Sequence, residues 1–189
     1  MDMLAKALAL FPASKPYADA LVACCERHQI NTPRRVASFI ATLAVESGRF
    51  RHTREIWGPT AQQLKYSPPH KVAKDLGNDK PQALAYAAAA FVDVGRFYAG
   101  HGLIQITGYD NHLAYSRATY GDDRCARAPR LLEQPLDAVR SAGWFWSTKK
   151  LNARADTLDL IDDRRAVNGG THGMSDFEAY FNQVLKAVT

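Results

Sequence analysis

The chain has 189 residues, of which 47% are hydrophobic and 23% are charged, an ordinary composition for a globular protein. This length predicts one domain with a sizeable core and room for two lobes. The net charge of +5 fits an anionic partner such as nucleic acid, a lipid surface or a cell wall. Nucleic acid is not expected, because no basic run is interleaved with aromatic residues. Stable membrane insertion is excluded, because no apolar run has transmembrane length.

Two features concern the compartment in which the protein folds. The three cysteines, Cys24, Cys25 and Cys125, are an odd number without metal-site spacing, so we expect reduced thiols and folding in a cytoplasm. The segment 1–11 starts with an acid and is interrupted by Lys6. A signal peptide has a basic start and an unbroken apolar centre, so this segment is predicted to be a short amphipathic helix instead.

The remaining sequence is predicted to be helical nearly throughout, with one small extended segment lining a cleft. Apolar residues at helical spacing, caps and breakers predict, in chain order, helices at 17–28, 33–46, 61–64, 70–76, 82–92 and 110–120, a helix opened by Gln134-Pro135 and carrying Trp144 and Trp146, and helices at 156–167 and 174–188. A polar loop is predicted at 121–130. No linker or repeat is visible, so residues 1–189 are interpreted as a single domain without an appended binding module.

The helix at 33–46 ends on the first candidate catalytic residue. Thr32 is its predicted N-cap and Pro33 its first residue. Its apolar residues recur at helical spacing, and Glu46 follows Leu43 by three positions on the same face. Gly48 is the predicted stop. A half-buried carboxylate at the negative end of a helix dipole is disfavoured as an anion, which suits a general acid near neutral pH.

Glu55 is the second candidate and follows Glu46 by nine residues. One continuous helix would place the two side chains on opposite faces, so the chain must turn at Gly48 for them to face each other. The flanking Arg51 and Arg54 would keep Glu55 ionised. Two carboxylates in contrasting environments form an acid–base pair. The alternative reading is that Glu55 is a surface residue among basic neighbours.

A second dense stretch runs from 95 to 108 and contains several glycines. After Gly102, the side chains of Leu103, Gln105 and Thr107 are predicted to point one way from an extended segment, with Ile104 and Ile106 on the other side. Its polar side could line a cleft, and the glycines would let a ligand approach the backbone. An ordinary buried hairpin strand is the alternative.

Other chemistries lack support in the sequence. The histidines are scattered without a metal-binding spacing, and no phosphate-binding or dinucleotide-binding fingerprint occurs, so neither a metal nor a cofactor is expected. Ser47 follows Glu46 but has no evident histidine base, which argues against a serine nucleophile.

Taken together, these motifs resemble glycoside hydrolase family 19, which comprises chitinases and peptidoglycan-degrading bacteriophage endolysins. The resemblance spans roughly residues 30–175, and the small size and the short gap between the glutamates are more similar to the endolysins. The segments that carry it are Ala44–Gly48, Arg54–Pro59, Gly77-Asn78, Tyr98–Asn111 and Val167–Gly170.

The resemblance implies a lysozyme-like bilobal helical fold with a cleft, and an inverting mechanism. Glu46 matches the general acid, Glu55 the general base and Thr107 the hydroxyl residue that helps to hold the attacking water. Further residues match polar positions that line the sugar cleft: Tyr98, Gln105, Asn111 and Asn168, with His101 as an additional donor.

The sequence departs from the family pattern in three respects. Val45 replaces a frequent histidine, Ala99 and His101 replace two arginines, and no counterpart of a plant-family arginine is evident after Gly170. The resemblance nevertheless implies a monomeric endolysin that hydrolyses β-1,4 bonds between amino sugars of peptidoglycan glycan strands. It would accumulate in the host cytoplasm and reach the periplasm and cell wall on release. A chitinase, a lytic transglycosylase and a non-enzymatic wall-binding protein remain as alternatives.

Overall fold

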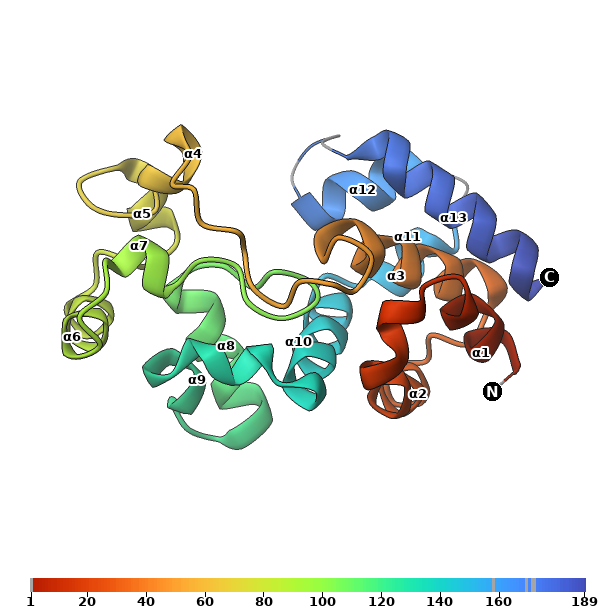
Figure 1. The fold of residues 1–189 in the computed structure, drawn as a ribbon, viewed down its shortest axis with the longest axis horizontal. Coiled ribbons are helices and arrows are strands. Elements are labelled where there is room, and N and C mark those ends of the chain that lie inside the picture. The colour runs from red at the N-terminus through yellow and green to blue at the C-terminus, as the bar shows by residue number, and fades with distance from the viewer. Residues whose placement is uncertain (1, 158, 169, 171–172) are drawn as a thin grey trace. The chain divides into compact units, whose positions relative to one another are not determined.

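The computed structural model of the protein describes residues 2–157, 159–168, 170 and 173–189, and these residues are mostly helical (Figure 1). The elements are α1 (Asp2–Ala9), the 3₁₀ helix η1 (Pro12–Tyr17), α2 (Ala18–Arg27), α3 (Pro33–Glu46), α4 (Ala61–Leu64), α5 (Lys71–Asp75), α6 (Pro81–Ala89), α7 (Val94–Phe97), α8 (Tyr109–Tyr120), α9 (Arg124–Arg127), the 3₁₀ helix η2 (Pro129–Glu133), α10 (Pro135–Thr148), α11 (Leu151–Ala155), α12 (Leu160–Asn168) and α13 (Met174–Val188). The predicted mainly helical fold class is confirmed.

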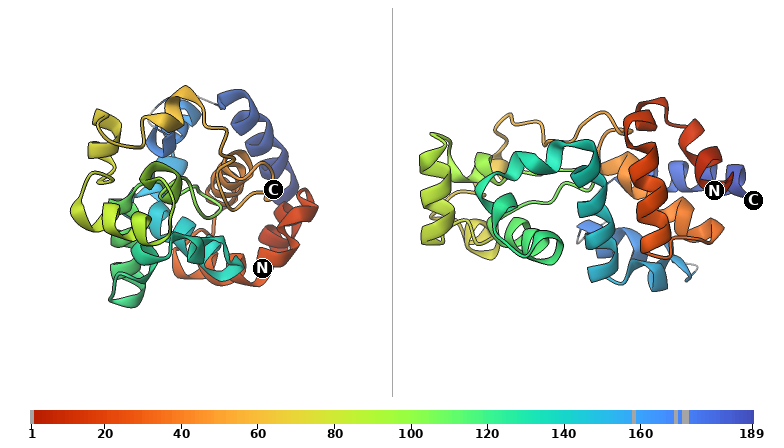
Figure 2. Two further views of the ribbon diagram at one scale, coloured as in Figure 1. Left: turned by 60° about the vertical axis from the view of Figure 1, so that its left-hand side comes forward. Right: turned by 90° about the horizontal axis from the view of Figure 1, so that it is seen from below.

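The contacts divide the chain into two compact units. The first comprises Met1–His52 and Val139–Thr189, and the second comprises Thr53–Ala138. Glu46 therefore belongs to the first unit and Glu55 to the second. Both chain ends belong to the first unit, where the N-terminal helix α1, drawn in red, and the C-terminal helix α13, drawn in blue, pack together (Figure 2).

The first unit is built around α3. Helices α1, α11, α12 and α13 all pack against it, and every residue from Val36 to Ala44 is buried. This stretch can be buried on all sides because it carries no charged residue and only two hydroxyl side chains, Ser38 and Thr42. The Thr32 side chain accepts a hydrogen bond from the Arg35 N–H and Pro33 opens the first turn, so the predicted start is confirmed.

A sharp turn follows α3, as the spacing of the two glutamates predicted. Gly48, Arg49 and Phe50 all have positive φ angles, of 57°, 64° and 66°. Buried Ser47 donates from Oγ to the Leu43 carbonyl at 2.5 Å and accepts from the Phe50 N–H at 2.8 Å. The serine hydroxyl thus stabilises the turn, because it bonds to backbone on both sides of it.

The second unit has its own core. Tyr98 and Tyr109 are buried there with Ala83, Ala87, Val94 and Ala126. Helix α6 contacts α7 and α9, and α8 contacts α9. The alanine-rich face of α6 fits this arrangement, because small side chains allow close packing.

Several predicted elements need correction. The loop predicted at 121–130 contains α9 and the start of η2, because Cys125 and Ala126 are fully buried, a tertiary effect that the polar local sequence conceals. The N-cap of α8 is Gly108 rather than Asp110. The Asp110 carboxylate, which was expected to cap the helix, accepts instead from Lys80 Nζ at 2.6 Å.

Towards the C-terminus, the helix predicted at 156–167 is displaced. It starts only at Leu160, and the short α11 precedes it. Gly169, part of the predicted helix stop, lies outside the described residues. Within the described ranges, no helix is long and apolar enough to cross a membrane. The three cysteines are buried and unbridged.

Candidate active site

Glu46 is the last residue of α3, and its side chain is 19% exposed. Arg164, on α12, donates from Nη1 to Glu46 Oε1 at 2.5 Å and is itself only 3% exposed. Both residues belong to the first unit. The carboxylate is therefore half-buried, as predicted, and held by a buried guanidinium. The role of Glu46 as general acid stays a prediction.

Sequence reasoning missed Arg164, because it sought an arginine after Gly170 rather than before it. A usable signal was present. Arg164 follows Leu160 by four residues and precedes Val167 by three, which places it on the apolar face of α12. A charged residue on such a face is rarely buried unless it is paired.

Glu55 lies in the second unit and is bonded through both carboxylate oxygens. Gln63 Nε2 donates to Oε1 at 2.9 Å, and the Gly100 N–H donates to Oε2 at 2.9 Å. The Glu55 N–H in turn donates to the Gly100 carbonyl at 2.8 Å. Hydrogen-bond donors of this kind stabilise an ionised carboxylate.

The hydrogen bonds to the Glu55 carboxylate come from Gln63 and Gly100, and the charge support expected from the flanking arginines stays a prediction. Arg51 is exposed and belongs to the first unit. Arg54 directs its Nε toward Glu133, 3.9 Å from Oε1.

The glycine-rich stretch forms a tight turn rather than an extended segment. The backbones of His101 and Ile106 pair through two hydrogen bonds of 3.0 and 2.8 Å. The backbone of His101 also forms an antiparallel β-bridge with that of Arg54. Gln105 adopts a left-handed φ of 58°. Leu103, Ile104 and Ile106 are all buried, so the predicted alternation is wrong and the alternative of a buried hairpin was closer. Compact packing pulls all three apolar side chains inward.

The predicted polar residues near this turn bond mainly to its backbone. Thr107 Oγ1 donates to the Gln105 carbonyl at 3.0 Å, and Gln105 Nε2 donates to the Gly102 carbonyl at 2.8 Å. Exposed Asn111 donates to the Thr107 carbonyl at 2.8 Å. Thr107 and Gln105 remain partly exposed. Their contacts with a sugar or with water stay predictions, and the side chain of Asn168 lies outside what the structure describes.

Tyr98 and His101 are placed differently from the prediction, because both are 0% exposed. The Tyr98 hydroxyl donates to the Ala126 carbonyl at 2.7 Å, so the ring belongs to the core of the second unit. His101 Nδ1 lies 3.2 Å from Nε2 of His112, and its Nε2 lies 3.6 Å from Glu133 Oε1. Burial at these positions argues against direct contact of either side chain with substrate.

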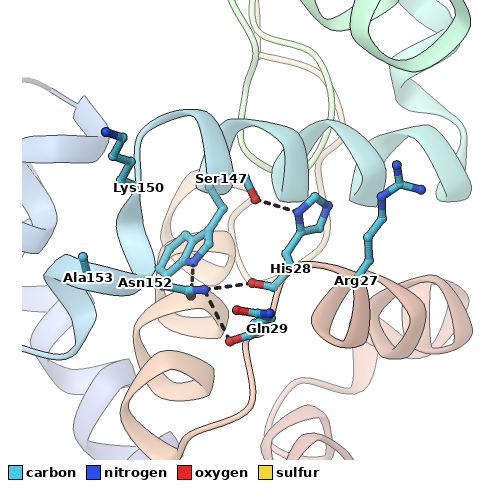
Figure 3. A pocket seen from close by; sticks show the side chains of 8 residues that line it. Arg27, His28, Gln29, Ser147, Lys150, Asn152 and Ala153 are labelled. Carbon is cyan, nitrogen blue, oxygen red and sulfur yellow. Dashed lines mark hydrogen bonds between the residues drawn. The ribbon is translucent and has the colours of Figure 1, made fainter.

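A cavity of about 350 Å³ lies in the first unit and is lined by none of the candidate residues (Figure 3). Its polar groups bond to each other. Ser147 Oγ lies 2.6 Å from His28 Nδ1, and Asn152 donates to the carbonyls of His28 and Gln29. Arg27 lies in the last turn of α2, where a cation complements the helix dipole, and Lys150 is the N-cap of α11. We interpret this cavity as a structural junction.

Enzymes that cleave glycosidic bonds use a pair of carboxylates, and the two glutamates held by hydrogen bonds are candidates for such a pair. The comparisons with known proteins agree with this class. No family model matches the chain. A protein of Haemophilus influenzae, named a glycosyl hydrolase family 19 domain-containing protein, is 31% identical over 182 residues, which covers 88% of this chain and 87% of the relative.

Solved structures show the same fold. Chitinase C from Streptomyces griseus HUT6037 superposes with a TM-score of 0.70 at 21% identity, covering 97% of this chain and 90% of that one. A bacterial family 19 chitinase superposes with a TM-score of 0.66 at 19% identity, covering 95% and 93%. The chain belongs to glycosyl hydrolase family 19, and is thereby a glycoside hydrolase.

Proposed function

We propose that this protein hydrolyses β-1,4 bonds between amino sugars in peptidoglycan by an inverting mechanism, with Glu46 as general acid and Glu55 as general base. The observation that carries the proposal is the fixed carboxylate of Glu55, which accepts one hydrogen bond on each oxygen. A carboxylate has about four acceptor positions, so both oxygens retain capacity for the proton of an attacking water.

The chemistry follows from the two roles. Glu46 gives its proton to the leaving oxygen, and Glu55 takes a proton from a water that attacks the opposite face of the sugar ring. Thr107 helps to hold that water. Inversion requires the two carboxyls to stand roughly 6.5–9.5 Å apart.

Peptidoglycan is favoured over chitin on charge. The protein carries a net charge of +5, and peptidoglycan bears carboxylates on its peptides whereas chitin is neutral. A basic protein gains affinity and association rate from an anionic polymer. Chitinase activity is the second candidate, because the solved structures with this fold include chitinases.

Digestion of purified bacterial peptidoglycan and of chitin oligomers, with products identified by mass spectrometry, tests the proposal. Hydrolysed reducing ends from peptidoglycan are expected, with inverted anomeric configuration by NMR. Anhydro-sugar ends would identify a transglycosylase, cleavage of chitin alone would identify a chitinase, and binding without cleavage would identify a wall-binding protein.

Two variants test the assigned roles. Glu46→Gln should abolish cleavage, and Glu55→Gln should reduce it by about 10²–10⁴-fold, the usual contribution of general acid–base catalysis. Circular dichroism should show that both variants are folded. Strong residual cleavage by folded Glu46→Gln would remove the central assignment.

We further propose that the protein acts as an endolysin in bacterial lysis. It would accumulate in the host cytoplasm and reach the wall after the membrane is permeabilised. Expression in bacteria should cause lysis only when a permeabilising agent is added, and Glu46→Gln should not lyse under either condition. Lysis without permeabilisation would contradict this route.

A further inference from the structure

Gln63 is a buried residue of α4 that contacts the candidate base. Its side chain is 4% exposed. Its Nε2 donates to Glu55 Oε1 at 2.9 Å and to the Ile56 carbonyl at 2.8 Å. A buried amide that reaches the reacting carboxylate from a different element is suited to control the geometry of that carboxylate.

The orientation of the Gln63 amide is fixed by its other end. Its Oε1 accepts from the N–H groups of Gly58 at 3.1 Å and Thr60 at 2.8 Å. Backbone N–H groups can only donate, so the atom that faces them must be the amide oxygen. The amide nitrogen must then face Glu55, and a flipped amide would lose all these bonds.

The segment that carries Gln63 is held in the same way. Thr60 and Gln63 form a capping box at the start of α4, in which the Gln63 N–H donates to Thr60 Oγ1 at 3.2 Å. One side chain therefore joins the start of α4, the turn at Gly58 and the carboxylate of Glu55. Its hydrogen-bonding capacity is fully used: two bonds are donated and two accepted.

We propose that Gln63 is a positioning residue for catalysis, whose amide holds the carboxylate of Glu55 in the rotamer and charge state of a general base. The inference rests on the proposed function, in which Glu55 is that base. Gln63 fixes Oε1 while Gly100 fixes Oε2, so the carboxylate plane is set by donors from two separate segments of the second unit.

Other titratable groups of the second unit also face Glu55 or its segment. Burial, with a contribution from the charge of Glu55, raises the pKa of Tyr66. Arg54 and His101 are directed toward Glu133, which lies 3.9 and 3.6 Å from them. The hydrogen bond to Glu55 Oε1 comes instead from the neutral amide of Gln63.

The test compares variants with the wild-type protein in the pH dependence of kcat/KM on purified peptidoglycan. Gln63→Glu keeps the size of the side chain and can still accept from Gly58 and Thr60, but it places a second carboxylate against Glu55. Like charges favour protonation of one partner. The acid limb of the profile, which reports the base, should move upward by about one pH unit or more, with kcat lowered and KM little changed.

Two controls separate positioning from a structural effect. Gln62→Glu adds the same charge at the exposed neighbouring position of α4 and should leave the acid limb in place. Thr60→Ala removes the hydroxyl that caps α4 but not the contact between Gln63 and Glu55. It should lower stability without moving the acid limb.

Each result of these measurements either supports the positioning role of Gln63 or overturns it. An unchanged acid limb in folded Gln63→Glu, or an equal displacement in Thr60→Ala, would overturn the proposal. If Gln63→Glu does not fold, Gln63→Met is measured in its place. Loss of the donor to Glu55 should by itself still move the acid limb of the kcat/KM profile upward. The Glu55→Gln variant tests separately whether Glu55 is the general base. Full activity of Glu55→Gln would refute the proposed function, whereas an inactive Glu55→Gln with an unmoved acid limb in the Gln63 variants would refute this inference alone.

Discussion

The buried pair of His101 and His112 predicts an acid-sensitive fold. His112 Nδ1 lies 2.7 Å from the Gly108 carbonyl and so must donate to it. In the neutral ring, Nε2 then accepts from Nδ1 of His101, 3.2 Å away. Burial lowers the pKa of His112 to about 4. Burial, followed by the charges of His112 and Arg54, lowers the pKa of His101 to about 2.

The direction in which pH changes the stability of the fold follows from proton linkage. An unfolded histidine titrates near pH 6.5, so below that pH the unfolded state binds protons that folded His112 does not. Its contribution to stability is complete above pH 6.5 and is lost as the pH falls toward 4. A gap of 2.5 pKa units at 1.36 kcal/mol per unit amounts to about 3 kcal/mol, of which roughly 2.4 kcal/mol is lost between pH 7 and pH 4.5. This is a large share of a typical unfolding free energy of about 5–15 kcal/mol.

Urea denaturation at a series of pH values between 7 and 4.5 measures this loss. His112→Asn should be less stable at pH 7, but its unfolding free energy should fall by roughly 2 kcal/mol less than that of the wild-type protein over this range. His70→Asn changes an exposed histidine at the N-cap of α5 and should behave as the wild type does. Equal losses for the wild-type protein and His112→Asn would refute the reasoning.

Two further predictions concern local structure. Thr32→Ala removes the acceptor for the Arg35 N–H and should lower the unfolding free energy by about 1 kcal/mol; an unchanged urea midpoint would contradict the role of this cap. Gly108→Ala and Gly121→Ala both place a side chain at positive φ, but a Cβ at Gly108 would lie 2.8 Å from the Leu76 carbonyl oxygen, whereas nothing lies within 4 Å of one at Gly121. Thermal denaturation should show Gly121→Ala costing about 1 kcal/mol and Gly108→Ala costing at least about 1 kcal/mol more; equal effects would contradict the close approach.

Much of the local structure was predictable because its signals act over a few residues. Thr32 and Pro33 set the start of α3, the capping pair of Thr60 and Gln63 sets α4, and the apolar stripe of α13 gave its bounds. Each cap joins a side chain to a backbone group within four positions, and the stripe repeats every three or four positions along one helix. Such information is contained in the local sequence whatever the rest of the chain does.

The sequence also identified both candidate glutamates, through spacing and family resemblance, but not the groups that hold them. Arg164 lies 118 positions from Glu46, and Gly100 lies 45 positions from Glu55. Gln63 was visible only as part of a short helix. Contacts of this kind depend on which elements pack together, and local periodicity does not contain that information.

What the sequence determined by itself is the helical class, the start and end of α3, and the identity of two carboxylates suited to sugar chemistry. Only the tertiary structure decided that Tyr98 and His101 are buried, that residues 102–105 form a tight turn, and that neutral donors rather than arginines hold Glu55. The physical reason is that burial is a property of the packed chain. A polar residue in a glycine-rich stretch can face a ligand or a core equally well, and only its distant neighbours decide which.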